Sequence, residues 1–96
     1  MTITKIIFIN TAMNTTMNTE LINSAKNSNL KLVKYLVNKG ADIHANNDEA
    51  LRFSAAYGHL KLVKYLINNG EDIHAENDYA LRYSAKNGHL EIVIRL

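Results

Sequence analysis

The stretch 60–69 has its apolar and polar residues arranged with the spacing of one helical turn. At 100° per residue, its apolar side chains gather on one face and its polar side chains on the other. The apolar face consists of Leu62, Val63, Leu66 and Ile67. The opposite face consists of Lys61, Lys64, Tyr65 and Asn68. This pattern predicts an amphipathic helix that buries one side.

The stretch 48–57 predicts a second helix, which has a narrow face of small side chains. The same angular step brings Leu51, Ser54 and Ala55 together, and the small residues allow close approach of a partner helix. We expect Asp48 to be its N-cap, because a carboxylate there can accept from the first free backbone N–H groups.

Two glycines are expected to end these helices. Gly58 follows the first helix and Gly70 the second, and glycine adopts the positive φ that such endings require. After Gly70, residues 71–77 are expected to run on as an extended loop.

The helix–turn–helix–loop pattern recurs with a period of thirty residues. Shifting the chain by this offset aligns 18–47 with 48–77, with 17 of 30 positions identical, and 48–66 with 78–96, with 11 of 19 identical. The predicted organisation is therefore a non-repeat segment, a degenerate unit, a complete unit and a truncated unit. Their bounds are 1–17, 18–47, 48–77 and 78–96.

The first unit and the segment before it depart from the pattern. Ser28-Asn29 stands where the next unit has Gly58-His59, and Asn18 or Thr19 must serve as the helix cap. The segment 1–17 matches no repeat and is expected to be irregular, with 2–10 forming a short strand or an apolar cover.

Neither helix of a unit reaches the ~12–15 residues that an isolated helix needs in water. A single unit therefore depends on its neighbours to cover its apolar face. The predicted fold is an all-α solenoid of about two and two-thirds helix–turn–helix units.

The length, charge and cysteine content exclude several classes of protein. Ninety-six residues suffice for one small domain, and the absence of cysteine excludes disulfides, thiolate metal sites and cysteine nucleophiles. The longest apolar run, 6–9, is too short for a secretory signal or a membrane span. We therefore expect an intracellular protein of cytoplasm or nucleus that is not secreted and has no membrane partner.

The motifs of the repeat resemble the ankyrin repeat, a helix–turn–helix–loop unit of about 33 residues. The resemblance covers 18–96 and is carried by residues at fixed spacing. They are Leu51, Ser54-Ala55, Gly58-His59, Val63, Leu66-Ile67, and Gly40-Ala41-Asp42-Ile43-His44-Ala45 with its copy Gly70-Glu71-Asp72-Ile73-His74-Ala75. The short period and the recurring Asp-Ile-His-Ala are similar to ankyrin arrays of giant DNA viruses of amoebae. The resemblance implies a non-catalytic module that binds a protein partner on its concave inner-helix face.

One departure from the family pattern bears on binding. Between Ala45 and Leu51 there are five residues where the family usually has eight, and none is a turn glycine. The projecting finger of the family is therefore expected to be a short loop, which moves the predicted binding surface to the inner helices.

The four histidines and two inward serines were considered as sites of chemistry. His44, His59, His74 and His89 recur every fifteen residues, but stacked repeats hold equivalent residues about 8–10 Å apart, too far for one zinc ion. We expect His59 and His89 to bond turn backbone, and Ser54 and Ser84 to bond their own helices. The sequence therefore predicts no catalytic residues, no metal site and no cofactor.

A basic stripe follows the second helices of the first two units. Its members are Lys31, Lys34, Lys61 and Lys64, with Tyr35 and Tyr65 between them. The stripe stops in the third unit, where Glu91 and Ile94 stand, and the formal net charge is only +2. A solvated face is therefore favoured over a phosphate track, and no nucleic-acid partner is expected.

The inner helices carry the residue types that anchor interfaces. The candidate partner-binding residues are Arg52, Phe53, Tyr57, Tyr79, Arg82, Tyr83 and Asn87. Aromatic and arginine side chains contribute most of the energy in many interfaces. The alternative is that Phe53 and Tyr83 only pack against the neighbouring repeat.

Two further hypotheses concern the chain as a whole. It could be a truncated or degenerate remnant of a longer array, with no independent activity. The final helix also ends on apolar residues without a polar cap, with Ile94 where earlier units have lysine. This predicts self-association through the C-terminal helix.

Overall fold

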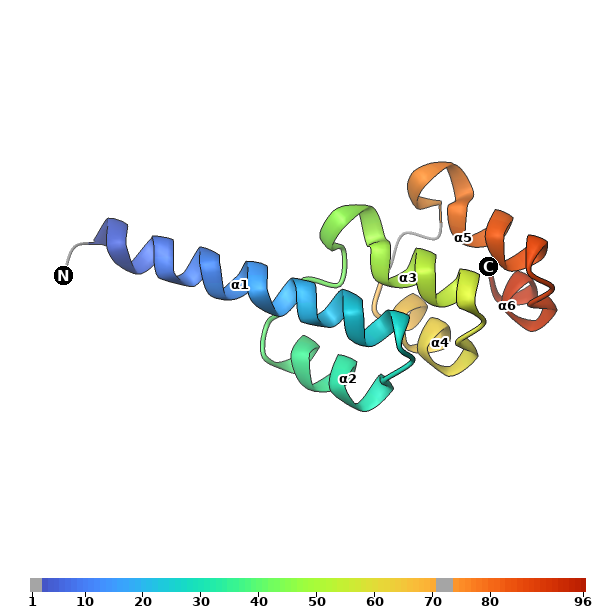
Figure 1. Ribbon diagram of the computed structural model, residues 1–96, viewed down its shortest axis with the longest axis horizontal. Helices are drawn as coiled ribbons and strands as arrows, with labels where there is room; N and C mark the ends of the chain where they lie inside the picture. Colours follow the sequence, from blue (N-terminus) through green and yellow to red (C-terminus); the bar gives the residue numbers. More distant parts are fainter. Residues whose placement is uncertain (1–2, 71–73) are drawn as a thin grey trace.

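The computed structural model describes residues 3–70 and 74–96, which form six helices and contain no strand. The helices are α1 (Ile3–Lys26), α2 (Leu30–Asn38), α3 (Ala45–Tyr57), α4 (Leu60–Asn68), α5 (Ala75–Lys86) and α6 (Leu90–Arg95). Figure 1 shows them following one another along the long axis of the molecule. The predicted all-α helix–turn–helix array is confirmed.

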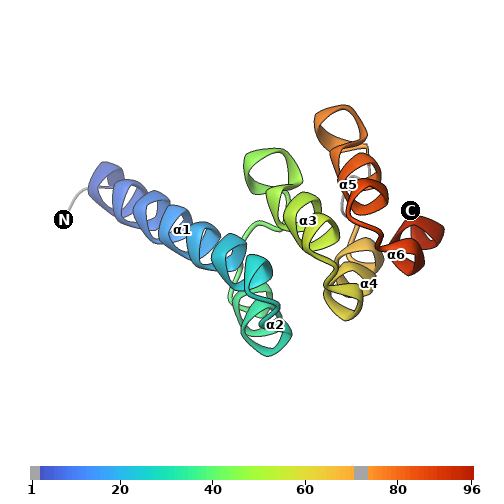
Figure 2. The same cartoon turned by 45° about the vertical axis from the view of Figure 1, so that its right-hand side comes forward.

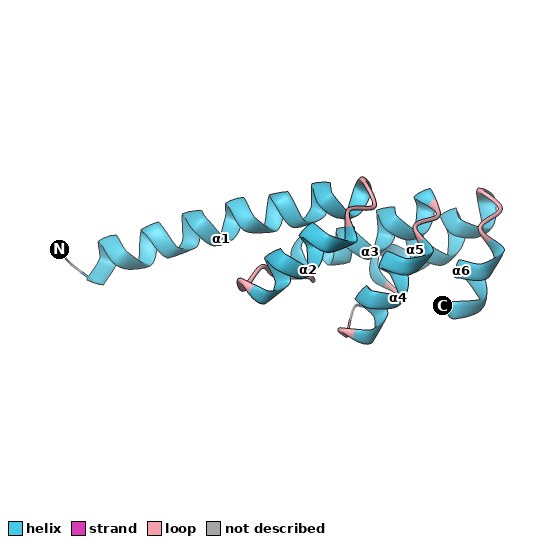
Figure 3. Ribbon diagram, turned by 90° about the horizontal axis from the view of Figure 1, so that it is seen from below, coloured by secondary structure: helices cyan, strands magenta, loops and turns pink. Residues whose placement is uncertain are grey.

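The helices form two layers. The first helices of the units, α1, α3 and α5, make one layer, with α3 packed between the other two. The second helices each pack against the first helix that precedes them, and α6 also packs against α4 (Figures 1 and 3). Each apolar face is thus covered by neighbouring units, as short helices require.

The core lies between the two layers. Leu51, Ser54 and Ala55 of α3 are fully buried, and Leu62, Val63 and Leu66 of α4 are at most 1% exposed. Ile67 is half-buried against the same cluster. The helix faces predicted from the spacing of apolar residues are therefore the faces that the structure buries.

Glycine ends the helices where the sequence predicted it. Gly58 has φ +84° and ends α3, and Gly70 has φ +87° one residue beyond the cap of α4. In the degenerate first unit the equivalent of Gly58 is Ser28, which takes the same left-handed conformation at φ +61°. Asn29 then caps α2, since its side chain accepts from the Leu32 backbone N–H at 3.2 Å.

The N-terminal segment differs from the expected irregular or extended structure. It is helical from Ile3 and continues without interruption into the first repeat, so α1 projects beyond the two layers (Figures 1 and 2). Residues 3–26 contain neither glycine nor proline, and adding a residue to an existing helix costs far less than nucleating one. The helix that docks on α3 can therefore extend outward.

The expected cap at Asn18 or Thr19 is wrong, because both residues lie inside α1. The Asn18 side chain instead accepts from the backbone N–H of Asp42 at 2.7 Å, and the Thr19 hydroxyl donates to the Thr15 carbonyl at 3.0 Å. Asn18 thus ties the loop after α2 to α1.

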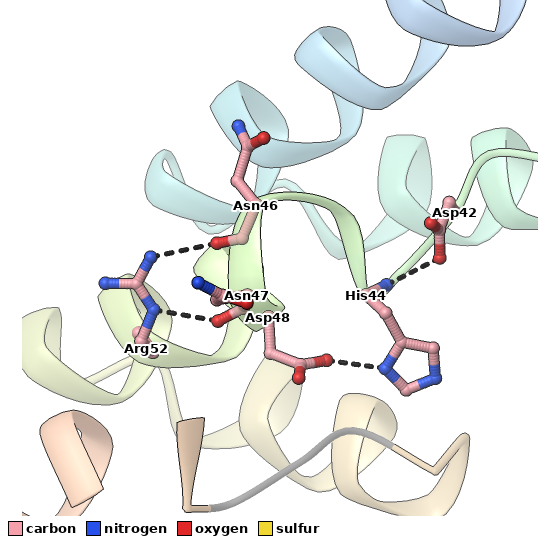
Figure 4. A network of polar contacts seen from close by, with 6 residues as sticks. All are labelled: Asp42, His44, Asn46, Asn47, Asp48 and Arg52. Atoms are coloured by element: carbon pink, nitrogen blue, oxygen red, sulfur yellow. Dashed lines mark hydrogen bonds and ion pairs between the residues drawn. The ribbon is translucent and has the colours of Figure 1, made fainter. Parts of the chain in front are cut away.

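The start of α3 is a left-handed turn and not a simple cap. Asn46, Asn47 and Asp48 all have φ near +56°, and right-handed helix follows them. Asparagine and aspartate tolerate this conformation better than other non-glycine residues. Asp48 does stand directly before the right-handed helix, but its carboxylate lies 2.5 Å from Nδ1 of His44 (Figure 4).

The same link recurs in the third unit, where His74 Nδ1 lies 2.5 Å from the Asp78 carboxylate and Asp78 has φ +60°. The loop expected at 71–77 does not extend to residue 77, because α5 begins at Ala75; residues 71–73 lie outside the described part.

Candidate protein-binding surface

Four aromatic side chains from α3 and α5 form a continuous row of contacts. Phe53 lies between Tyr57 and Tyr79, with ring centroids 5.8 and 5.4 Å apart respectively. Tyr79 in turn stacks on Tyr83, with centroids 4.2 Å apart and planes 23° apart. The row crosses from the second unit to the third.

Cations accompany this row along its length. Arg52 lies between Phe53 and Tyr79, 5.6 and 5.2 Å from their ring centroids. Arg82 stands in the same way beside Tyr79 and Tyr83, at 5.9 and 5.5 Å. Lys26 also lies beside Phe53, with its Nζ 4.5 Å from the ring centroid, and Lys86 lies at the Tyr83 end of the row, 5.5 Å from that ring. We call these eight residues the aromatic–cation strip.

The repeat explains why these residues come together. Arg52 and Phe53 stand thirty positions before Arg82 and Tyr83, so equivalent points of adjacent parallel helices carry the same residue types. Because α3 and α5 pack side by side, matching positions face the same surface of the layer. Tyr79 replaces Glu49 at the equivalent position and joins the two pairs of rings.

Arg52 is also fixed by the backbone of its own unit. Its Nε donates to the Asn47 carbonyl at 2.9 Å, and an η nitrogen donates to the Asn46 carbonyl at 3.0 Å (Figure 4). These carbonyls belong to the left-handed turn, so the guanidinium braces the turn while it lies beside the rings. Arg52 therefore has a structural role as well as its predicted place on the surface.

Exposure differs among the predicted residues. Tyr57 is 51% exposed and Arg82 is exposed, whereas Arg52, Phe53, Tyr79 and Tyr83 are half-buried. Phe53 contacts neighbours in both adjacent units, Lys26 and Tyr79. The interpretation that Phe53 packs against the next repeat is thus correct in part, while the outer side of the row stays accessible.

The structure gives Asn87 a contact apart from the rings. Its side-chain Nδ2 donates to the Ala56 carbonyl, 2.8 Å away at the end of α3. Asn87 joins the second and third units at the turn end of the layer, and a role in partner binding stays a prediction.

Sequence reasoning missed two members of the strip, Lys26 and Lys86. Both occupy the position of Ala56 in the complete unit, so the thirty-residue alignment contains the signal that places them beside the rings. Glu49 was also missed: its carboxylate lies 3.0 Å from Nζ of Lys26 and connects α1 to α3.

The comparison with protein families decides what kind of array this is. A family model described as ankyrin repeats, in three copies, matches residues 2–77. The chain belongs to the ankyrin repeat family. Ankyrin repeats are generally protein–protein interaction modules and are typically non-catalytic. No curated protein matches the sequence.

His59 and the two inward serines of the ankyrin units make the backbone bonds expected of them, whereas the bond expected for His89 stays a prediction. His59 Nε2 donates to the Lys26 carbonyl at 2.8 Å, so it bonds the backbone that ends the preceding unit's first helix. Ser54 donates to the Ala50 carbonyl and Ser84 to the Leu81 carbonyl, which confirms that both bond their own helices. Each buried hydroxyl thus has a hydrogen-bond acceptor within its own helix.

The described part of the ankyrin array shows no group of three or more His, Asp or Glu side chains placed to hold a metal ion. Among the same residues, no helix has both the length and the apolar content needed to span a bilayer.

Proposed function

We propose that the chain is a non-catalytic module that holds a protein partner on the aromatic–cation strip. The observation that supports this is the row of rings and cations that crosses two units with its outer side accessible. Aromatic and arginine side chains are enriched among the residues that dominate interface energies.

The contacts within the strip favour binding for a second reason. Ordering a rotamer-rich side chain on association costs about 0.5–1.5 kcal/mol. Here Arg52 is already held by two carbonyls and two rings, and Tyr79 is stacked on Tyr83. A partner would therefore meet side chains that have already lost much of their freedom.

The test compares two tyrosines of similar exposure on different layers. Tyr57 belongs to the strip and is 51% exposed, while Tyr35 lies on α2 and is 57% exposed. Tyr57→Ser and Tyr35→Ser are each used as bait in an extract of the source cells, beside the unchanged protein, and bound proteins are quantified. Far-UV circular dichroism checks that both variants are folded.

We expect the unchanged protein and Tyr35→Ser to capture one selective partner. Tyr57→Ser should capture at least tenfold less of that partner. Equal loss in both variants, or loss only in Tyr35→Ser, would place the binding surface elsewhere. A folded protein that enriches no partner would instead support the alternative of a remnant array without independent activity.

A further inference from the structure

The aromatic–cation strip carries an excess of positive charge. It holds four cations, Lys26, Arg52, Arg82 and Lys86, and among the described side chains the carboxylate of Glu49 lies against it, at Lys26. The excess is local, because the whole chain has a formal net charge of only +2. A partner that docks here is selected by charge as well as by shape.

We propose that the strip binds an acidic peptide segment, whose carboxylates pair with Arg52, Arg82 and Lys86. This inference rests on the proposed function and names the chemistry of the partner. Guanidinium groups beside aromatic rings keep in-plane N–H donors, which match the two oxygens of a carboxylate. The rings supply apolar contact to the stems of Asp and Glu side chains.

The arrangement of the rings favours carboxylates over nucleic-acid bases. A stacking platform for bases needs open ring faces. Phe53, Tyr79 and Tyr83 each have two cations within 6 Å of their centroids and at least one neighbouring ring. These cations and rings take up the space that a stacked base would need, so the strip favours a partner that binds its N–H donors and only touches the accessible side of the rings.

The spacing of the cations suits an extended peptide. Arg52 and Arg82 occupy equivalent positions on adjacent helices, whose axes are typically about 8–10 Å apart. In an extended chain, side chains two residues apart point to the same face and are separated by about 7 Å. With the reach of the long arginine side chains, carboxylates two residues apart can therefore pair with both guanidinium groups.

A peptide-display selection tests this proposal. A library of random twelve-residue peptides is selected on the full chain, and the affinity of the enriched peptides is measured by fluorescence anisotropy for the unchanged protein, for Tyr57→Ser and for three charge variants. Arg82→Gln/Lys86→Gln removes two positive charges from the strip without touching the bonds that brace the turn of α3. Lys86→Gln alone changes one exposed side chain. Lys31→Gln/Lys61→Gln removes the same charge as the first variant from exposed positions on the other layer.

We expect the enriched peptides to be rich in Asp and Glu at a spacing of two. Their affinity should fall about tenfold or more in Arg82→Gln/Lys86→Gln, less in Lys86→Gln, and by under about twofold in Lys31→Gln/Lys61→Gln. A thymidine oligonucleotide of equal charge should bind more weakly than the peptides.

Four results would overturn the proposal. Peptides without an acidic bias that still lose affinity on Tyr57→Ser would leave the proposed function intact and refute the acidic partner. Equal losses of peptide affinity in the two double variants would show that the peptides are attracted by the overall charge of the protein and not by the strip. Tighter binding of the oligonucleotide would make nucleic acid the ligand, and a selection that enriches no peptide would contradict both the partner chemistry and the proposed function.

Discussion

The imidazole of His89 lies directly against Gly58, one unit away. A Cβ placed on Gly58 would come within 2.6 Å of the ring carbon Cε1, closer than real Cβ atoms approach such a neighbour. His89 stands immediately before α6, and Gly58 ends α3. This contact fixes how the turn of the third unit stacks on the turn of the second.

Gly58→Ala should be more destabilising than Gly88→Ala. Both glycines have φ near +80°, so both substitutions carry the backbone cost of a left-handed alanine, about 1–2 kcal/mol. Only Gly58 has His89 against it, and nothing lies within 4 Å of a Cβ on Gly88. Urea denaturation measures the difference in the free energy of unfolding. Equal losses of stability would show that the His89 side chain moves aside without a further loss.

Leu66→Ala should be severely destabilising. Leu66 is fully buried in the central unit, and such a truncation typically costs about 2–5 kcal/mol from lost burial and a residual cavity. Leu90→Ala is the matched control, because Leu90 is 68% exposed. Thermal melts should show a large drop for the first variant only, and similar melts for both would mean that α4 buries a different face.

Ser28→Gly should stabilise the protein. Ser28 holds φ +61° where the complete unit has Gly58, and relief of this strain outweighs the extra freedom of glycine in the unfolded chain. We expect a gain of about 0.5–1 kcal/mol in the free energy of unfolding. Ser28→Ala removes the same hydroxyl but keeps the strain, so it should bring no gain. A loss of stability with glycine would refute the interpretation.

Ile94→Lys should reduce self-association without lowering the melting temperature. Ile94 is 82% exposed on α6, next to the exposed Leu90, and the last helix presents both to solvent. Leu96 is half-buried against the core and is left unchanged. Sedimentation velocity at rising concentration should show association of the unchanged chain and less in the variant. A monomer at all concentrations would contradict the prediction.

The sequence predicted the fold and the buried faces because they follow from a repeated spacing. Leu62 and Leu66 stand at a spacing that a helix brings to one side, and Gly58 marks the end of the helix before them, which carries Leu51. The turn at Asn46, Asn47 and Asp48 escaped prediction, since consecutive left-handed residues other than glycine are rare. The helical N-terminus was also not predicted, because residues 1–17 match no repeat and their own pattern favours no single structure.

The candidate surface was predicted in its residue types but not in its connections. The positions of Arg52, Phe53, Arg82 and Tyr83 follow from the repeat, whereas the stacking of Tyr79 on Tyr83 depends on side-chain conformation. The contact of Lys26 with Phe53 depends on where α1 ends, which the degenerate first unit obscured. The thirty-residue repeat places residues along the sequence, but it does not give the side-chain positions on which contacts between units depend.

The most direct test of the protein-binding role is site-specific photocrosslinking. A benzophenone-bearing residue replaces Tyr57 in one preparation and Tyr35 in another, and each is irradiated in an extract of the source cells. We predict a single crosslinked product, heavier by the mass of one partner, when the benzophenone stands at position 57, and no such product when it stands at position 35. Crosslinking only at Tyr35, or the same species at both positions, would contradict the assignment of the partner to the aromatic–cation strip.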